Sequence, residues 1–144
     1  MSAQTAKLTS RCRACGGTLI RQVNQFVDDA GRLCWDTGFS CESCGDGGCE
    51  DFGSGETPGY IRDALLAEHG PSRLRLAGPV AGMVPVLKVL REELRVSLPQ
   101  ARELAGELAG PGLTGTSAEM EYLNLRLRRR GIAAEVRSDG PEGG

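Results

Sequence analysis

Two pairs of cysteines near the start of the chain have the spacing of metal-binding turns. The pairs are Cys12-Arg-Ala-Cys15 and Cys41-Glu-Ser-Cys44, and a glycine, Gly16 or Gly45, follows each of them. Two thiolates two residues apart can hold one tetrahedral ion if the backbone turns tightly with its N–H groups pointing at sulfur, and a glycine permits that turn. A matched pair of such turns is much stronger evidence than a single one. We therefore expect one structural zinc ion, bound by Cys12, Cys15, Cys41 and Cys44.

Other uses of the cysteines remain open. A redox-active pair would need a strand–helix–strand context, which the sequence around Cys12 does not indicate. An iron–sulfur cluster could recruit Cys49, which could also replace Cys44 as a ligand. Cys34 is expected to be a small buried side chain within a strand. The single histidine, His69, is expected to end a helix rather than to bind metal.

The stretch between the cysteine pairs predicts a β-hairpin that brings them together. Residues 18–27 and 33–40 are rich in β-forming side chains, and DDAGR (28–32) has the composition of a turn. With a cysteine turn at each end, residues 11–49 resemble the zinc-ribbon family. We expect this ribbon and the acidic loop after it to form a domain over 1–56.

Glycine and acidic residues dominate 45–59, which predicts a solvated loop. Within 41–57 there is no basic residue, and the acidic ones are Glu42, Asp46, Glu50, Asp51 and Glu56. An alternative to the solvated loop is an acidic surface that meets a basic partner. After this segment, Thr57 and Pro58 predict the start of a connecting helix over 57–71.

Strands and helices are expected in the order β-α-α-β-α-β over 72–138. Residues 73–76 alternate like a half-buried strand, and 84–94 place their apolar residues on one helical face. Ser97-Leu-Pro-Gln100 and Thr116-Ser-Ala-Glu119 are capping boxes that predict two further helices. A short extended piece at 113–115 and a closing strand at 132–136 complete an α+β domain, and a flexible tail is expected over 139–144.

This order of elements, together with VLKVLREELRVSLPQARELAGEL, resembles the C-terminal domain of the bacterial ribosomal stalk protein over about residues 73–137. The resemblance implies three helices and a short sheet, with a surface that faces translation factors. Lys88, Arg91 and Arg102 stand at the matching basic positions of that surface. The chain departs from the family at Arg95-Val96-Ser97, where the stalk protein has a glycine-rich turn.

Composition narrows the classes of function. The chain has 144 residues, 40% of them apolar and 25% charged, which predicts a folded protein of one ordinary or two small domains. Its net charge of -2 does not favour binding to nucleic acid or a membrane surface. We expect a soluble cytoplasmic protein, since no signal peptide or run of 18 apolar residues is present. In that compartment, clustered cysteines bind metal more often than they form disulfides.

The chain contains no recognised catalytic motif and only one histidine, which excludes most nucleophile–histidine designs. We therefore expect a protein-interaction protein that is not an enzyme, with zinc as its cofactor and neither a membrane nor a small-molecule substrate as its target. The most specific hypothesis is a toxin-neutralising immunity protein or antitoxin that blocks a nucleic-acid-acting toxin. The alternatives are a ribosome- or translation-factor-associated module and a nucleic-acid-binding zinc ribbon that uses the arginines at 126 and 128–130.

Overall fold

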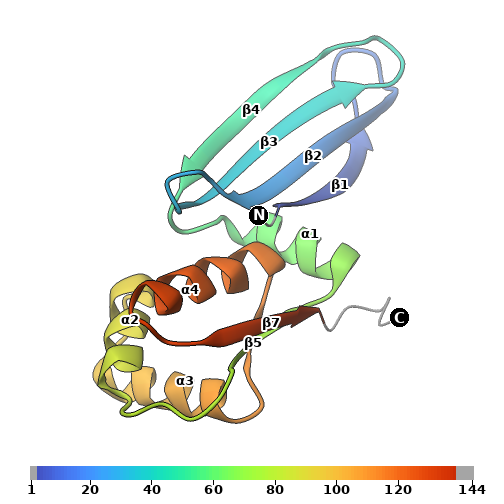
Figure 1. The fold of residues 1–144 in the computed structure, drawn as a ribbon. Coiled ribbons are helices and arrows are strands. Elements are labelled where there is room, and N and C mark those ends of the chain that lie inside the picture. Colours follow the sequence, from blue (N-terminus) through green and yellow to red (C-terminus); the bar gives the residue numbers. More distant parts are fainter. Residues whose placement is uncertain (1–2, 139–144) are drawn as a thin grey trace. The chain divides into compact units, whose positions relative to one another are not determined.

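The chain divides into two units, Met1–Gly70 and Pro71–Gly144. The computed structural model describes residues 3–138, so the tail expected over 139–144 lies outside the described residues (Figure 1). Each unit has its own cluster of buried apolar side chains. Both units combine helices with an antiparallel sheet, and the fold is α+β.

Four antiparallel strands form the sheet of the first unit, in the order β1-β2-β3-β4 (Figure 1). They are β1 (Ala3–Arg11), β2 (Thr18–Val27), β3 (Leu33–Cys41) and β4 (Gly47–Ser54). Strands β2 and β3 are the expected hairpin. The carboxylate of Asp28 closes their turn by accepting hydrogen bonds of 2.9 Å from the backbone N–H groups of Ala30 and Arg32.

The sequence predicted a solvated loop over 45–59, but residues 47–54 form strand β4. The prediction was therefore wrong for these residues. Strand β4 pairs with β3 along its length, with a bulge between Thr37 and Gly38. Nearly every β4 side chain is exposed. The strand therefore lacks the alternation of apolar and polar residues from which a strand is predicted. A bidentate ion pair between Arg21 of β2 and Glu50, with its shorter contact at 2.6 Å, fastens the strand to the sheet.

Helix α1 (Gly59–His69) belongs to the first unit and covers one face of its sheet. Ile61 and Leu65 of the helix are fully buried against Ala6 and Val23 of β1 and β2. The expected N-cap, Thr57, does not cap the helix: its hydroxyl accepts a 2.8 Å hydrogen bond from the buried side chain of Gln25. This bond ties the start of the helix to β2 in place of a cap.

Three helices and a three-stranded antiparallel sheet build the second unit, whose strand order is β6-β5-β7. Its elements are β5 (Ser72–Leu76), α2 (Val84–Leu94), α3 (Leu98–Ala109), β6 (Leu113–Gly115), α4 (Ser117–Arg129) and β7 (Ala134–Ser138). The predicted order of strands and helices is confirmed, and α2 has the predicted bounds. The core of this unit contains the fully buried Leu74, Leu90, Leu108 and Leu127.

Local hydrogen bonds explain where the helices of the second unit begin and end. Ser97 and Gln100 form a reciprocal capping box at α3, and Thr116 and Glu119 form another at α4, as predicted. After α4, Gly131 has a φ of +75°, and the N–H of Ile132 reaches back to the carbonyl of Leu127 at 2.9 Å. Over residues 3–138, none of the helices has the length and apolar character needed to span a membrane.

A fragment containing residues 71–138 is expected to fold alone and without metal. All six cysteines lie in the first unit, and the second has its own apolar core, so a chelator should leave the fragment unchanged. Far-ultraviolet circular dichroism with and without EDTA measures this. Loss of the helical signal on addition of the chelator would show that the second unit depends on the metal centre.

Candidate metal centre

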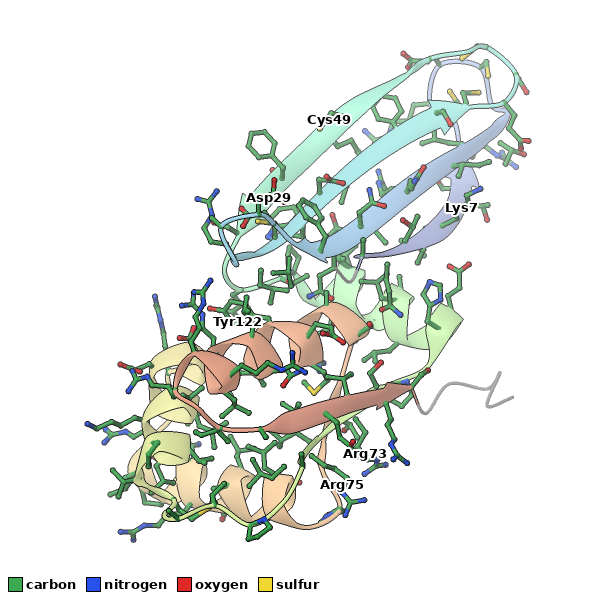
Figure 2. All side chains as sticks on the ribbon, in the orientation of Figure 1. Lys7, Asp29, Cys49, Arg73, Arg75 and Tyr122 are labelled. Atoms are coloured by element: carbon green, nitrogen blue, oxygen red, sulfur yellow. The ribbon has the colours of Figure 1, made fainter. Side chains whose placement is uncertain are left out.

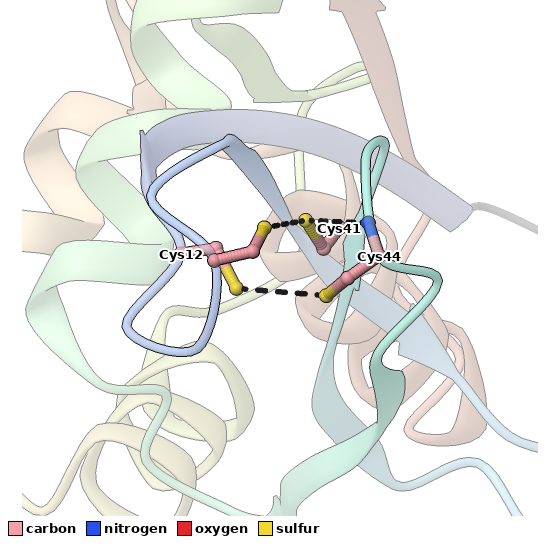
Figure 3. A group of neighbouring side chains, drawn as sticks. Cys12, Cys41 and Cys44 are labelled. Carbon is pink, nitrogen blue, oxygen red and sulfur yellow. Dashed lines mark hydrogen bonds between the residues drawn. The ribbon is translucent and has the colours of Figure 1, made fainter.

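The four cysteines of the two predicted turns come together at one end of the first sheet (Figure 3). Their sulfur atoms all lie within 4.8 Å of one another. The sulfur of Cys12 is 3.9 Å from that of Cys44, and the sulfur of Cys15 is 3.5 Å from that of Cys41. A tetrahedral ion with zinc–sulfur bonds of about 2.3 Å would separate its sulfurs by about 3.8 Å. The cluster is therefore close to the size that one tetrahedral metal ion requires.

The two turns have the same backbone geometry. In the first, the N–H of Cys12 donates to the carbonyl of Gly17 and the N–H of Gly16 donates to the carbonyl of Cys12, both at 2.8 Å. In the second, Cys41 bonds to Asp46 at 2.8 Å and Gly45 to Cys41 at 3.1 Å. Gly16 and Gly45 have φ angles of +77° and +74°, which strongly favour glycine. The predicted role of these two glycines is confirmed.

Contacts between the two turns were not predicted from the sequence. The N–H of Glu42 donates to the carbonyl of Thr18 at 3.0 Å, which joins the second turn to the strand after the first. A Cβ atom at Gly17 would lie 2.8 Å from the Cβ of Ser43. The second glycine of CRACGG therefore allows the two turns to approach closely enough to share an ion.

Backbone N–H groups also point at the sulfur atoms. Cys41 accepts at 3.4 Å from the N–H groups of Ser43 and Cys44, and Cys15 accepts at 3.4 Å from that of Gly17. Donors at these positions stabilise thiolates, which are the ligand form of cysteine. The turns thus supply hydrogen-bond donors that favour the thiolate form of Cys15 and Cys41.

The sulfurs lie too close together for all four to carry charge unless a cation sits between them. The N–H of Cys44, followed by that of Ser43, lowers the pKa of Cys41 to about 6. At Cys44 the N–H of Asp46 favours the thiolate, but contacts with Cys41 and the other cysteines outweigh it and raise the pKa to about 12. Metal binding at neutral pH must therefore displace protons from this cluster.

Cys34 and Cys49 lie outside the cluster, in agreement with a four-cysteine site. Cys34 is half-buried, and its thiol lies 3.6 Å from the Asp28 carboxylate, so it is not the purely apolar side chain expected from the sequence. Cys49 is exposed on β4, opposite Gly38. His69 ends α1, as predicted, and its Nε2 lies 2.7 Å from the carbonyl of Thr5.

The other side chains singled out in the sequence fall in two different units. Glu42 and Asp46 lie in the second cysteine turn, and Glu50 and Asp51 lie on β4. All four acids are exposed, but Glu50 is also paired with Arg21, which holds the pKa of its carboxyl below the usual value. In the second unit, exposed basic side chains line two helices: Lys88 and Arg91 on α2 and Arg102 on α3.

The basic run at the end of α4 takes part in contacts within the second unit. Arg126 lies 3.6 Å from Glu93 of α2 and 5.2 Å from the centroid of the Tyr122 ring, and Arg130 pairs with Glu92 at 2.6 Å. The hydroxyl of Tyr122 donates a hydrogen bond to the carboxylate of Glu93. Two of the four arginines therefore join α4 to α2.

Comparison with known proteins found no family model that matches this chain and no matching curated protein.

Proposed function

We propose that the protein is a non-catalytic interaction protein, held together in its first unit by structural zinc, that acts by occupying the surface of a partner protein. The observation that carries the proposal is the closed set of four thiolate ligands. Four cysteines use every position of a tetrahedral zinc ion, and such sites stabilise a fold without activating water or substrate. The only histidine is engaged with a backbone carbonyl, so it does not complete a nucleophile–histidine pair.

The most specific form of this proposal is an immunity protein or antitoxin that covers the basic working surface of a toxin. The charge of the first unit supports this proposal. Residues 1–70 contain six basic and ten acidic side chains, which gives a net charge of -4. Glu42 and Asp46 are exposed in a turn that a metal would hold rigid, and Asp51 is exposed on β4, the strand that follows this turn. Rigid acids lose little entropy on binding and speed the approach of a basic partner.

A second candidate is a module that binds translation factors, and the surface of α2 favours it. Lys88 and Arg91 are exposed there, together with Val84 and Leu94, which are 62% and 40% exposed. Arg102 adds a further cation from α3. A mixed apolar and basic helix surface is a common form of protein contact surface, and its basic positions are those that the resemblance to the stalk protein assigns.

Charge reversal on each unit distinguishes the two candidates. We expect Glu42→Lys, Asp46→Lys and Asp51→Lys together to slow association with the captured partner by about tenfold or more, because complementary charge acts mainly on the association rate. Glu50 is left unchanged, because its lysine variant would face Arg21. The matched variant carries Lys88→Glu, Arg91→Glu and Arg102→Glu.

The partner would be captured from native lysate with and without RNase, identified by mass spectrometry, purified and measured by surface plasmon resonance. Metal content and circular dichroism of both variants must equal those of the wild type. If only the basic-to-acidic variant loses the partner, the contact lies on the second unit and the translation-factor proposal replaces the first. Capture that disappears with RNase would favour nucleic acid.

A further inference from the structure

The face of the first sheet that points away from α1 contains a cavity of about 440 Å³. Side chains alternate between the two faces of a strand. Ala6 and Val23 pack against α1. The residues next to them along β1 and β2 therefore point to the opposite face of the sheet. The cavity is lined by residues of the inner strands and β4, among them Gln22, Asn24, Asp36, Gly38, Ser40 and Cys49.

Strand register explains why the sheet is hollow at this place. Gln22, Gly38 and Cys49 are cross-strand partners on β2, β3 and β4, so the middle position of this row has no side chain. Asp36 and Ser40 flank Gly38 along β3 on the same face. Cys49 lies on β4 (Figure 2) and lines the cavity. The floor is therefore flat peptide backbone, and the walls combine polar side chains with the apolar side chain of Ile20.

A chain of hydrogen bonds holds the carboxylate of Asp36 in place. The hydroxyl of Thr5 donates to Oδ1 of Asn24, and Nδ2 of Asn24 donates to Oδ1 of Asp36, each at 2.6 Å. Within residues 3–138, no hydrogen bond or ion pair is assigned to the second carboxylate oxygen of Asp36. A fixed carboxylate with one oxygen available is well suited to bind a cation.

We propose that this cavity binds the guanidinium group of an arginine side chain. Among the described residues, 3–138, Asp36 is the only charged one that lines the cavity, and the unit around it has a net charge of -4, so the site favours a cation. The inference deepens the proposed function, because it rests on a basic partner protein and names the side chain by which that partner would be recognised.

The shape of the cavity favours guanidinium over ammonium. Guanidinium is planar, can lie over a flat floor such as Gly38, and offers N–H donors in a fork toward two sides. The carboxylate of Asp36 lies at one end of the cavity, and the side-chain amide oxygen of Gln22, two residues along β2 from the partner of Asp36, offers a second acceptor to one side. Ser40 is four residues from Asp36, roughly 13 Å along β3, so one guanidinium group does not reach both. An ammonium group is more strongly hydrated and presents a compact point charge, so it would match this spread of acceptors less well.

Titration of the zinc-loaded full-length protein with N-acetyl-L-arginine amide tests the proposal without the partner. We expect saturable changes in the ¹⁵N-resolved amide resonances of Asn24, Asp36, Gly38 and Cys49. The citrulline amide keeps the shape of the probe but removes its charge, and should bind about tenfold more weakly, as expected for loss of a charge-assisted hydrogen bond. The lysine amide should also bind more weakly than the arginine amide.

Two matched pairs of variants locate the site. Asp36→Asn should weaken binding of the arginine amide by about tenfold, whereas Asp29→Asn removes the same charge from the β2–β3 turn and should have no effect (Figure 2). Cys49→Phe should fill the cavity and abolish binding, whereas Cys49→Ser should preserve it. Each variant must first show the metal content and dispersed spectrum of the wild type.

Absence of saturable shifts overturns the proposal, as does equal binding of the citrulline amide or an unchanged affinity in Asp36→Asn. Equal affinity for the lysine amide overturns the preference for guanidinium. These results do not depend on partner capture. A failed titration therefore leaves the proposed function standing, and a partner that does not bind the first unit leaves the arginine site standing.

Discussion

Replacing any one of Cys12, Cys15, Cys41 or Cys44 with serine is expected to release the metal and unfold the first unit. The buried apolar cluster there is small and centres on Ile61 and Leu65. Structural zinc contributes about 10 to 16 kcal/mol to the folding of small zinc-finger peptides at neutral pH. That range is comparable to the entire stability of a typical domain, about 5 to 15 kcal/mol. Loss of one ligand should therefore remove most of the free energy of unfolding of this unit.

Trp35 reports this unfolding specifically, because it is the only tryptophan and packs against the core of the first unit. Its emission should shift to longer wavelength in each ligand variant, with metal analysis showing less than one zinc per chain. Cys49→Ser is the matched control, since Cys49 is an exposed cysteine of the same unit outside the cluster. A ligand variant that keeps both its metal and its native emission would show that the site is not structural.

The two cysteine turns were predictable from sequence because the geometry of each turn is local. Two CxxC turns with a glycine after each specify the backbone independently of the rest of the chain, and the observed φ angles of Gly16 and Gly45 follow from this. The helix starts at Ser97 and Thr116 were predictable for the same reason, because a capping box is complete within four residues. The resemblance to the ribosomal stalk protein stays a proposal.

Strands β1 and β4 could not be predicted because their partners, rather than their own residues, make them strands. Strand β1 contributes only Ala6 to the buried core, and β4 is made largely of glycine, acid and exposed residues. Such residues are depleted in strands and give no alternation to read. Pairing with β2 and β3 supplies the hydrogen bonds that these sequences do not specify by themselves.

The cavity proposed to bind arginine could not be predicted from the sequence because it depends on the register of three strands. Gln22, Gly38 and Cys49 are far apart in the chain, and a change of one residue in pairing would send them to opposite faces. The bulge between Thr37 and Gly38 sets which β4 residue faces Gly38. The sequence predicts the two strands of the hairpin, but it does not predict their register with each other or with β4.

Separate apolar cores predict that the two units unfold separately. Leu65→Ala should lower the free energy of unfolding of the first unit by about 2 to 5 kcal/mol, the usual cost of emptying a fully buried leucine site. Leu127→Ala should cost a similar amount in the second unit, because Leu127 is 1% exposed and lies in the other core. Each substitution should leave the unfolding transition of the other unit unchanged.

Denaturant titrations followed by two signals measure this. Trp35 emission reports the first unit, and the helical circular-dichroism signal comes mainly from α2, α3 and α4 of the second. Leu8→Ala and Val84→Ala are the controls, since these residues are 36% and 62% exposed and should change stability by less than about 1 kcal/mol. If Leu65→Ala shifts both signals together, the units unfold as one cooperative body, and the metal would then stabilise the partner-binding surfaces of both.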